Sequence, residues 1–238
     1  MRGLLFLAVL ATLSGGEAAA KQVTLEYFYL PPFSYSDATG PAGSALALAQ
    51  SISAGLNITL RPEPTPLRRL AFEAAKNPVL VAAIFRTPAR EDSYQWVGRL
   101  CTEHFSMVTR AAAPAVDSLE QAKGLKQIGV AAGASNETFL RERGFTNLDA
   151  AASIELEVRR LAEGYDDAWF APRSGALHAW KVAGHDPAQL HFGTPITSME
   201  IWMAASNVVS PPIVETLRAR FEEKVKSGEV AAATGCSE

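Results

Sequence analysis

The run VLVAAIF, from Val79 to Phe85, restricts the fold more than any other stretch of the chain, because all of its residues are apolar. A half-exposed strand alternates apolar and polar residues, whereas a strand of a parallel sheet that helices cover on both faces is apolar throughout. Further β-rich runs alternate with helical stretches along the chain, which is the pattern of α/β proteins. The sequence therefore predicts an α/β fold.

The predicted elements fall into two series of similar size, with no low-complexity linker between them. In the first series, we expect strands over residues 23–30, 58–62 and 79–85, and helices over residues 44–56 and 66–76. In the second, we expect strands over residues 105–110, 127–132 and 167–171, and helices over residues 137–143 and 154–163. A strand over residues 200–206 follows, and a last helix can be capped by Ser210 and closed by Gly228. Two such series indicate two lobes.

Residues 1–20 have the pattern of a secretory signal peptide. Arg2 precedes an apolar run from Leu4 to Leu13, and three small residues, Ala18 to Ala20, follow. The apolar run is too short to span a bilayer, and no later stretch approaches the roughly 20 apolar residues of a transmembrane helix. No cysteine lies at the expected cleavage region to carry a lipid anchor. We therefore expect a cleaved, exported, soluble and periplasmic protein that does not insert into the membrane.

Charge and cysteine content narrow the choice of partners. The formal net charge of -3 gives no basic patch for nucleic acid or anionic lipid. The two cysteines, Cys101 and Cys236, are an even count in an exported chain, which favours a disulfide between the C-terminal tail and the middle of the chain. Spacing alone does not decide pairing, so two unpaired thiols remain an alternative. We expect a monomer.

Three motifs in the same order carry a resemblance to a known family. They are YLPPFSYSDATGPAGSALALAQSI, then RRLAFEAAKNPVLVAAIFRTPAREDSYQWVGRL, then IGVAAGASNETFLRERGF. Together they resemble the family 3 bacterial extracellular solute-binding proteins, the periplasmic components of amino-acid uptake systems. The resemblance implies a two-lobed flytrap with two mixed, mainly parallel sheets and two hinge crossings. The first lobe would comprise residues 21–102 and 196–238, and the second lobe residues 103–195.

The resemblance also implies a carboxylate site after the apolar strand. In this family the Arg of a Thr-x-x-Arg motif holds the ligand's carboxylate and the Thr lies beside it, which corresponds to Arg90 and Thr87. A guanidinium there can bind a carboxylate through two parallel N–H bonds. Arg86 is a neighbouring, less certain candidate. The alternative is that Arg90 opens a surface helix and pairs with Glu91 or Asp92.

Other positions match the family's ligand site less closely. Tyr29 and Phe33 follow the first strand and are expected to form an apolar wall against the ligand, although ordinary core packing is an alternative. Arg68 is a candidate for reaching the cleft. Gly133 and Ser135 lie between a strand and a helix N-terminus, where backbone N–H groups can bind an anion, although Ser135 can also simply cap the helix.

One departure from the family concerns the ligand's amino group. Amino-acid binders of this family commonly carry an acidic residue a few positions after the equivalent of Asp167, and this chain has Ala171 in that region. Trp169 is expected near the cleft, and Glu200 is a weak candidate for a replacement acid. Because a buried ammonium without a carboxylate is costly, the resemblance does not assure an ordinary α-amino acid as ligand.

Catalysis finds little support in the sequence. The chain has no Gly-x-Ser-x-Gly, His-Glu-x-x-His or phosphate-loop motif, and its four histidines lack metal-ligand spacing, so we expect no enzyme, metal or cofactor. The favoured function is a solute receptor that delivers its ligand to an ABC permease. The alternatives are an extracytoplasmic sensor or partner module without a transporter, and a cyclohexadienyl or arogenate dehydratase-like enzyme on the same fold, which would need an acid in the cleft.

Overall fold

The structure is a computed structural model that describes residues 21–56 and 58–236, without the side chains of residues 21–22, 58–61 and 68. The expected signal peptide, residues 1–20, lies outside the described residues. The strands are β1 (Lys21–Tyr27), β2 (Tyr35–Asp37), β3 (Gly40–Ala42), β4 (Ile58–Pro64), β5 (Val79–Phe85), β6 (Tyr94–Arg110), β7 (Ile128–Ala131), β8 (Leu148–Ala151), β9 (Ala168–Pro172), β10 (Leu190–Phe192) and β11 (Thr197–Ser206). The helices are α1 (Ser44–Ser53), α2 (Leu67–Lys76), α3 (Leu119–Lys123), α4 (Ser135–Arg141), α5 (Ile154–Glu163), α6 (Arg173–Val182), α7 (Pro211–Lys226) and α8 (Glu229–Thr234), with 3-10 helices η1 (Pro88–Ser93) and η2 (Pro187–Gln189).

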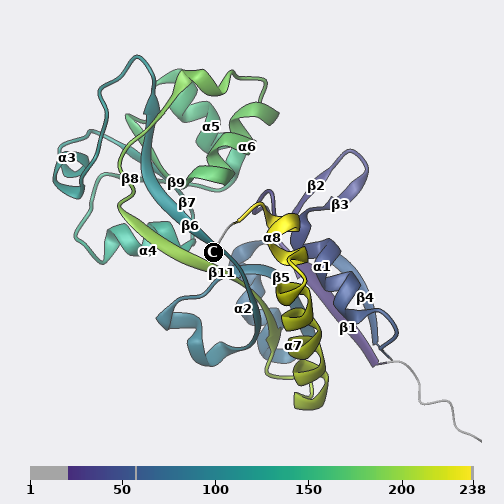
Figure 1. The fold of residues 1–238 in the computed structure, drawn as a ribbon. Helices are drawn as coiled ribbons and strands as arrows, with labels where there is room; N and C mark the ends of the chain where they lie inside the picture. Colours follow the sequence, from purple (N-terminus) through teal and green to yellow (C-terminus); the bar gives the residue numbers. More distant parts are fainter. Residues whose placement is uncertain (1–20, 57, 237–238) are drawn as a thin grey trace, which may run out of the picture.

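Two long antiparallel strands, β6 and β11, connect two lobes (Figure 1). The first lobe contains β1 to β5, α1, α2, α7 and α8, and the second lobe contains β7 to β10 and α3 to α6. On the first lobe β11 pairs with β5, and on the second lobe β6 pairs with β9. Because β6 has 17 residues, at about 3.3 Å each it is long enough to belong to both lobes. The chain therefore crosses between the lobes twice.

The predicted α/β fold class is confirmed, with one difference in how the sheets are organised. The strands of the two lobes form one hydrogen-bonded sheet in the order β4-β1-β5-β11-β6-β9-β7-β8, and β10 pairs with β6. The parallel pairs, β1 with β4 and β5 and β7 with β8 and β9, lie at its two ends. The two expected sheets are thus continuous with each other, because β6 and β11 pair along their length.

Strand β5 begins and ends where the apolar run predicts, and all of its residues are buried. Its side chains pack in two layers, one on each face of the sheet. Leu80 belongs to the core cluster that includes Leu46 of α1, whereas Val81 packs in the cluster that includes Leu70 of α2. A strand buried on both faces has no position for a polar side chain, so the first polar groups after Phe85 come where the strand ends.

The C-terminal part of the chain is fastened to the connecting strands. Helix α7 begins at Pro211 with Ser210 at the N-cap position, as predicted, but the Ser210 side chain makes no capping hydrogen bond. Gly228 separates α7 from α8 with a left-handed φ of 78°. Cys236, just after α8, is joined to Cys101 of β6 in a disulfide with a Cα–Cα distance of 5.7 Å. This bridge closes a sequence separation of 135 residues and holds α8 against the middle of β6.

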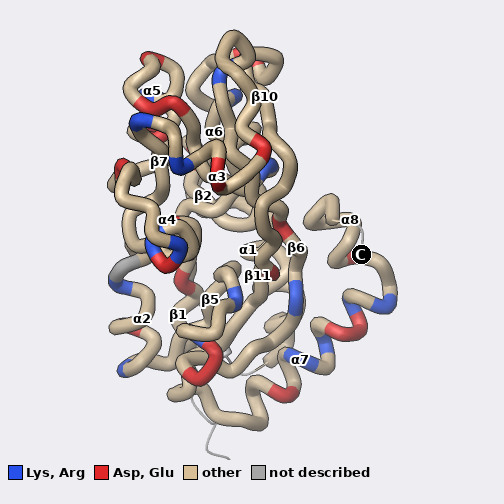
Figure 2. The backbone as a smooth tube through the Cα atoms, turned by 90° about the vertical axis from the view of Figure 1, so that its left-hand side faces the viewer, with Lys and Arg blue, Asp and Glu red and all other residues tan. Residues whose placement is uncertain are grey.

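Charged residues of both signs are interspersed on the outer elements. In Figure 2, Lys or Arg and Asp or Glu alternate along α7. Among the helices in the described part of the chain, none combines the length and apolar character needed to cross a membrane.

Candidate functional site

A pocket of about 940 Å³ lies between the lobes and is lined by residues of both. Its walls come from segments that follow the carboxyl ends of six strands, β1, β4, β5, β7, β8 and β9. The carboxyl ends of the parallel strands in each lobe lie at one edge of the sheet, where loops rather than strands provide the surface. The two edges face each other across the pocket.

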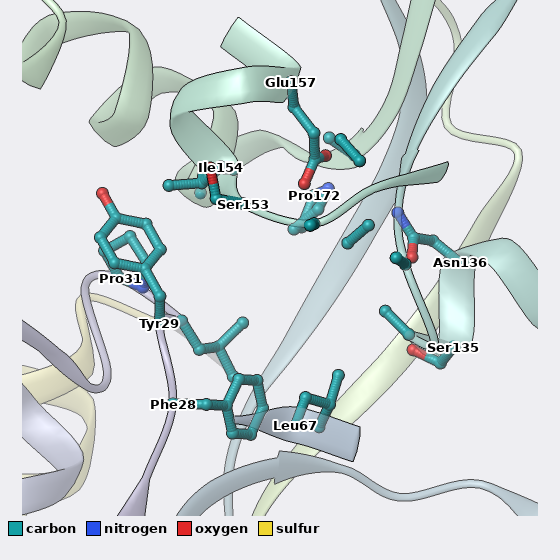
Figure 3. Close-up of a pocket in the computed structure, with 18 of the residues that line it drawn as sticks. Phe28, Tyr29, Pro31, Leu67, Ser135, Asn136, Ser153, Ile154, Glu157 and Pro172 are labelled. Carbon is teal, nitrogen blue, oxygen red and sulfur yellow. The ribbon is translucent and has the colours of Figure 1, made fainter. Parts of the chain in front are cut away.

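Most of the pocket wall is apolar. Phe28, Tyr29 and Leu67 line it from the first lobe, and Ile154 lines it from the second (Figure 3). Trp169 lines it from the second lobe as well. The ends of β7 and β8 and the segments after them contribute mainly small side chains, namely Ala131, Ala132, Ala134, Ala150, Ala151 and Ala152. Because these side chains are small and apolar, the wall leaves space for the ligand and offers few hydrogen-bonding groups to it.

Arg90 is the basic residue of the pocket wall, and it comes from η1 directly after β5. Its Nη1 donates a hydrogen bond of 3.0 Å to the carbonyl of Phe85. Burial lowers the pKa of Arg90 from its ordinary value, and the nearby Tyr94 opposes this effect. Within the described residues no carboxylate forms an ion pair with Arg90. It is therefore a partly buried cation in the pocket wall, and no carboxylate of the described residues is its counter-ion.

Arg86 has a different role from Arg90. Its guanidinium forms a two-pronged ion pair with Glu91 and lies between two indole rings, 5.0 Å from the centroid of Trp96 and 4.6 Å from that of Trp202. Arg86 is not part of the pocket wall. The pairing with Glu91 that the sequence allowed for Arg90 is thus made by Arg86, which leaves Arg90 to face the pocket.

Glu157 of α5 is a pocket residue that the sequence analysis did not identify. It is 3% exposed, and the Nε1–H of Trp169 donates to its carboxyl group. Burial raises the pKa of Glu157 to about 8, the neighbouring Asp166 and Glu155 add to the rise, and the hydrogen bond from Trp169 opposes it. In Figure 3 its carboxyl group points from α5 into the space between Tyr29 and the N-terminus of α4. The pocket therefore contains an acidic group as well as Arg90.

A pattern in the sequence does mark Glu157. Counting from Ile154, the apolar residues Val158 and Leu161 lie four and seven positions on, which defines the face of α5 that packs inward. Glu157 falls on the same face. A carboxylate on the apolar face of an amphipathic helix is a signal for a buried acid.

Four of the predicted site residues line the pocket together: Arg90, Tyr29, Ser135 and Trp169. Ser135 is buried at the start of α4, next to Asn136, whose Nδ2 donates to the carbonyl of Phe170 at 2.8 Å. Tyr29 is half-buried, and burial raises its pKa to about 12.

The other predicted residues lie elsewhere. Phe33 is 1% exposed and packs in the core of the first lobe, which is the alternative that the sequence analysis considered. Thr87 lies between β5 and η1 but not in the pocket wall. Gly133 lies outside the wall too, and its N–H donates to the carboxylate of Glu137 at 2.6 Å. Arg68 is in α2, and its side chain lies outside the described part of the structure.

The region where the family carries its acid is apolar in this chain. Ala171 lines the pocket at the end of β9 and provides no polar group. Glu200, the weak candidate for a replacement, does not line the pocket. Its carboxylate accepts a hydrogen bond of 2.9 Å from Trp202 Nε1 and lies 3.5 Å from Arg99. In the described ranges, 21–56 and 58–236, no group of three or more His, Cys, Asp or Glu side chains could hold a metal ion.

Ring contacts join the two lobes beside the pocket. The ring of Tyr35, on β2 of the first lobe, lies 5.0 Å from that of His178, on α6 of the second lobe, and the ring of Tyr29 lies 6.4 Å from it. Burial lowers the pKa of His178, as does the nearby Lys181. The structure is thus a conformation in which the lobes are in contact.

The chain is similar to known proteins in its structure and not in its sequence. No family model matches the sequence, and no curated protein matches it either. A histidine kinase sensor domain with similarity to periplasmic binding proteins has a TM-score of 0.81 at 15% identity, over 90% of this chain and 95% of its own. An ancestral arginine-binding protein bound to arginine has a TM-score of 0.78 at 18% identity, over 91% and 99%.

A third solved structure is similar to this chain over most of its length. The substrate-binding protein of an ABC uptake transporter from Streptococcus pneumoniae, with bound histidine, has a TM-score of 0.77 at 15% identity, over 90% of this chain and 92% of its own. Identities this low establish similarity of fold alone. Together with the two lobes and their double connection, the comparisons show that this chain has the two-lobed fold of periplasmic binding proteins.

Proposed function

We propose that this protein is an exported receptor that binds a small carboxylate-bearing ligand, an amino acid or a related compound, in the pocket between its lobes. The observation that carries the proposal is Arg90, a partly buried guanidinium in the pocket wall that no carboxylate of the described chain neutralises. Leaving a charge unpaired in a partly desolvated position is costly, and a ligand carboxylate would supply the missing partner through charge-assisted hydrogen bonds.

Binding would be coupled to closure of the lobes. We propose that residues 21–102 and 196–238 move as one body and residues 103–195 as the other, with β6 and β11 as the connection. A ligand that contacts Arg90 on the first lobe and the α5 and β9 walls on the second would favour the closed form, in which the rings of Tyr35 and His178 meet. Disulfide-linked α8 would stay with the first lobe.

We propose that the partner at the membrane is an ABC permease that recognises the closed form and receives the ligand. A sensor protein is the second possibility, and the similarity to a histidine kinase sensor domain is the observation that favours it. The export signal expected in residues 1–20 would place either complex at the outer face of the cytoplasmic membrane.

Thermal unfolding tests the receptor function. The protein, residues 21–238, would be scanned with amino acids, small carboxylates, polyamines and prephenate, and Arg90→Ala would be scanned beside it. A ligand at 100 times its dissociation constant stabilises the folded state by about 2.7 kcal/mol, which is visible as a higher Tm. We expect a carboxylate to raise the Tm of the wild type and not that of the variant. A shift that survives in Arg90→Ala would refute the proposed site.

A second candidate function, a dehydratase-like enzyme, is favoured by one observation, the buried Glu157 in the pocket wall. An acid there could protonate a leaving hydroxyl group, which departs as water while a carboxylate of the substrate leaves as carbon dioxide and its bonding electrons complete an aromatic ring. Incubation with prephenate distinguishes the two functions. Formation of an aromatic product that Glu157→Gln abolishes would support the enzyme, whereas a Tm shift without turnover would support the receptor.

A further inference from the structure

We infer that Glu157 acts in the pocket as a neutral carboxylic acid that donates a hydrogen bond to the ligand, and that the ligand is therefore an apolar-bodied carboxylate with a hydrogen-bond acceptor in place of an ammonium group. This inference rests on the proposed function, because it takes the carboxylate at Arg90 as given. It identifies a specificity-determining residue and the chemical class that this residue selects.

The first argument is the surroundings of the carboxyl group. Glu157 is 3% exposed, so water does not stabilise a negative charge on it. Its hydrogen bond in the structure comes from Trp169 Nε1–H. A carboxylate accepts this bond more strongly, but the carbonyl oxygen of a neutral carboxylic acid accepts it too. The hydroxyl group of the acid then remains available for the pocket.

The second argument is the charge of the neighbouring groups. On α5 itself Glu155 is an acidic neighbour, and Asp166, in the turn before β9, is another. Both oppose ionisation of Glu157. Burial and these two charges together agree with the rise of its pKa to about 8, so the acid holds its proton at neutral pH.

The cations packed against α5 are engaged elsewhere. Arg160, one turn further along α5, forms an ion pair with Asp149 of β8 and lies 3.8 Å from Asp166. Arg110 of β6 donates to the carbonyl of Leu161 at 2.7 Å. On α6, Arg173 lies 4.3 Å over the ring of Phe192, and His178 contacts the two tyrosine rings of the first lobe. In the described part of the chain none of these forms an ion pair with Glu157.

The third argument is what the rest of the pocket lacks. Arg90 needs an anion, but most of the wall is built from aromatic, aliphatic and alanine side chains, and Ala171 stands near the end of β9. The wall also includes Glu155, a carboxylate that is exposed. A ligand ammonium would have to stay beside the exposed Glu155, be buried against the apolar wall, or strip the proton from Glu157. A ketone, hydroxyl or ether oxygen needs none of these, because it accepts the hydrogen bond that Glu157 already offers.

Matched ligands and two variants test the inference by titration calorimetry. Each set contains a hydrocarbon acid, an oxo acid and an amino acid: 4-methylpentanoate, 4-methyl-2-oxopentanoate and leucine, and hexanoate, 5-oxohexanoate and 5-aminopentanoate. In at least one set we expect the oxo acid to bind about tenfold or more tightly than the other two at pH 7. Its affinity should fall as pH rises above about 8, where Glu157 ionises.

The variants separate the two roles that Glu157 could take. Glu157→Gln keeps a neutral donor and an acceptor for Trp169, so it should keep the affinity for the oxo acid within about threefold and lose the pH dependence. Glu163→Gln, an exposed site at the end of α5 that does not line the pocket, is the matched control and should behave as wild type.

The outcomes distinguish failure of this inference from failure of the proposed function. The inference is wrong if the amino acids bind more tightly than the oxo acids, with an affinity that rises with pH and is lost in Glu157→Gln. Glu157 would then be an ionised carboxylate that binds the ammonium group of the ligand. The inference is also wrong if the hydrocarbon acids bind as tightly as the oxo acids. If the wild type binds no carboxylate in a manner that depends on Arg90, the proposed receptor site itself fails.

Discussion

The imidazole of His178 lies against the ring of Tyr35 with the ring centroids 5.0 Å apart, so a helix of the second lobe contacts the small β2–β3 sheet of the first. The contact is beside the pocket, and Tyr29, which lines the pocket, shares it. Separation of the lobes would break it.

The effect of this contact on closure can be measured with Tyr35→Leu. An aromatic pair is worth about 0.5–1.5 kcal/mol beyond its buried area, so ligand affinity should fall by about 2- to 10-fold while the free energy of unfolding of the ligand-free protein changes little. Calorimetric titration with the ligand found by thermal scanning gives the affinity. Tyr165→Leu, at a ring that is 65% exposed on the second lobe, is the control. Equal losses in the two variants would contradict a role in closure.

Arg90 should lower the stability of the ligand-free protein. The variant Arg90→Met replaces a partly buried charge, which has no carboxylate partner in the described structure, with an apolar side chain, so we expect the free energy of unfolding to rise by about 0.5–2 kcal/mol. The matched variant Arg86→Met breaks the ion pair with Glu91 and the contacts with two indole rings, and should lower it. Urea unfolding without ligand measures both. A loss of stability in Arg90→Met as large as in Arg86→Met would show that Arg90 is a structural residue.

The stability of the protein should fall as the pH rises, in part because of Glu157. Its folded-state pKa of about 8 lies above the ordinary value of 4.5, so the folded state binds the proton more tightly than the unfolded state. The resulting stabilisation is fully present below pH 4.5 and is lost as the pH rises through 8.

Glu157→Gln isolates this contribution. One pKa unit corresponds to about 1.4 kcal/mol, so the variant should lose a few kcal/mol less than wild type between about pH 5 and pH 9. Part of the slope should remain in the variant, because burial and the carboxylates of Glu73 and Glu63 also raise the pKa of Glu26 to about 7. Urea unfolding at a series of pH values provides the comparison. Parallel pH profiles for the variant and wild type would mean that Glu157 is ionised in the folded protein.

The disulfide should stabilise the protein and hold its C-terminal helix in place. Cys101→Ser is expected to lower the free energy of unfolding by about 2–5 kcal/mol, and Cys236→Ser by the same amount, since either change removes the same bond. The double variant should match the single ones. Hydrogen exchange should show the largest loss of protection in α8. Reduction of wild type would reproduce these effects, and equal stability of oxidised and reduced protein would contradict the prediction.

The parts of the fold that follow from local pattern were predictable. Val79–Phe85 is apolar at every position and forms β5 with those bounds, and Ile154–Glu163 forms α5, with Ser153 accepting a hydrogen bond from Leu156 N and Gly164 in a left-handed conformation. These elements carry their own start and stop signals.

Strand β6 was predicted too short because its first half depends on distant packing. The sequence predicted a strand from Phe105, whereas the strand begins at Tyr94. Gly98 interrupts the strand pattern, yet it is the residue that lets α7 approach, because a Cβ atom there would lie 2.1 Å from the ring of Phe221. A helix more than 100 residues later in the chain thus explains a residue that looks locally like a strand breaker.

The site was only partly predictable for a similar reason. Arg86 and Arg90 are both close enough in the sequence to pair with Glu91. Arg86 forms the ion pair, because the turn of η1 and the two indole rings from β6 and β11 hold its guanidinium beside Glu91. Glu157 lies on α5, outside the motifs that resemble a known family, and its place in the pocket wall beside Trp169 of β9 depends on the packing of the second lobe.

Three alanines of the pocket wall, Ala132, Ala134 and Ala152, have a consequence for how this protein could be given a new ligand. They follow the ends of β7 and β8, so an enlarged side chain there would add to the pocket wall without replacing a residue of the sheet. Side chains of different size at these three positions would therefore change the shape of the pocket, while Arg90 and Glu157 stay as they are. The size of the ligand's body and the polar groups that bind it depend on different residues of the chain, and each can be changed without the other.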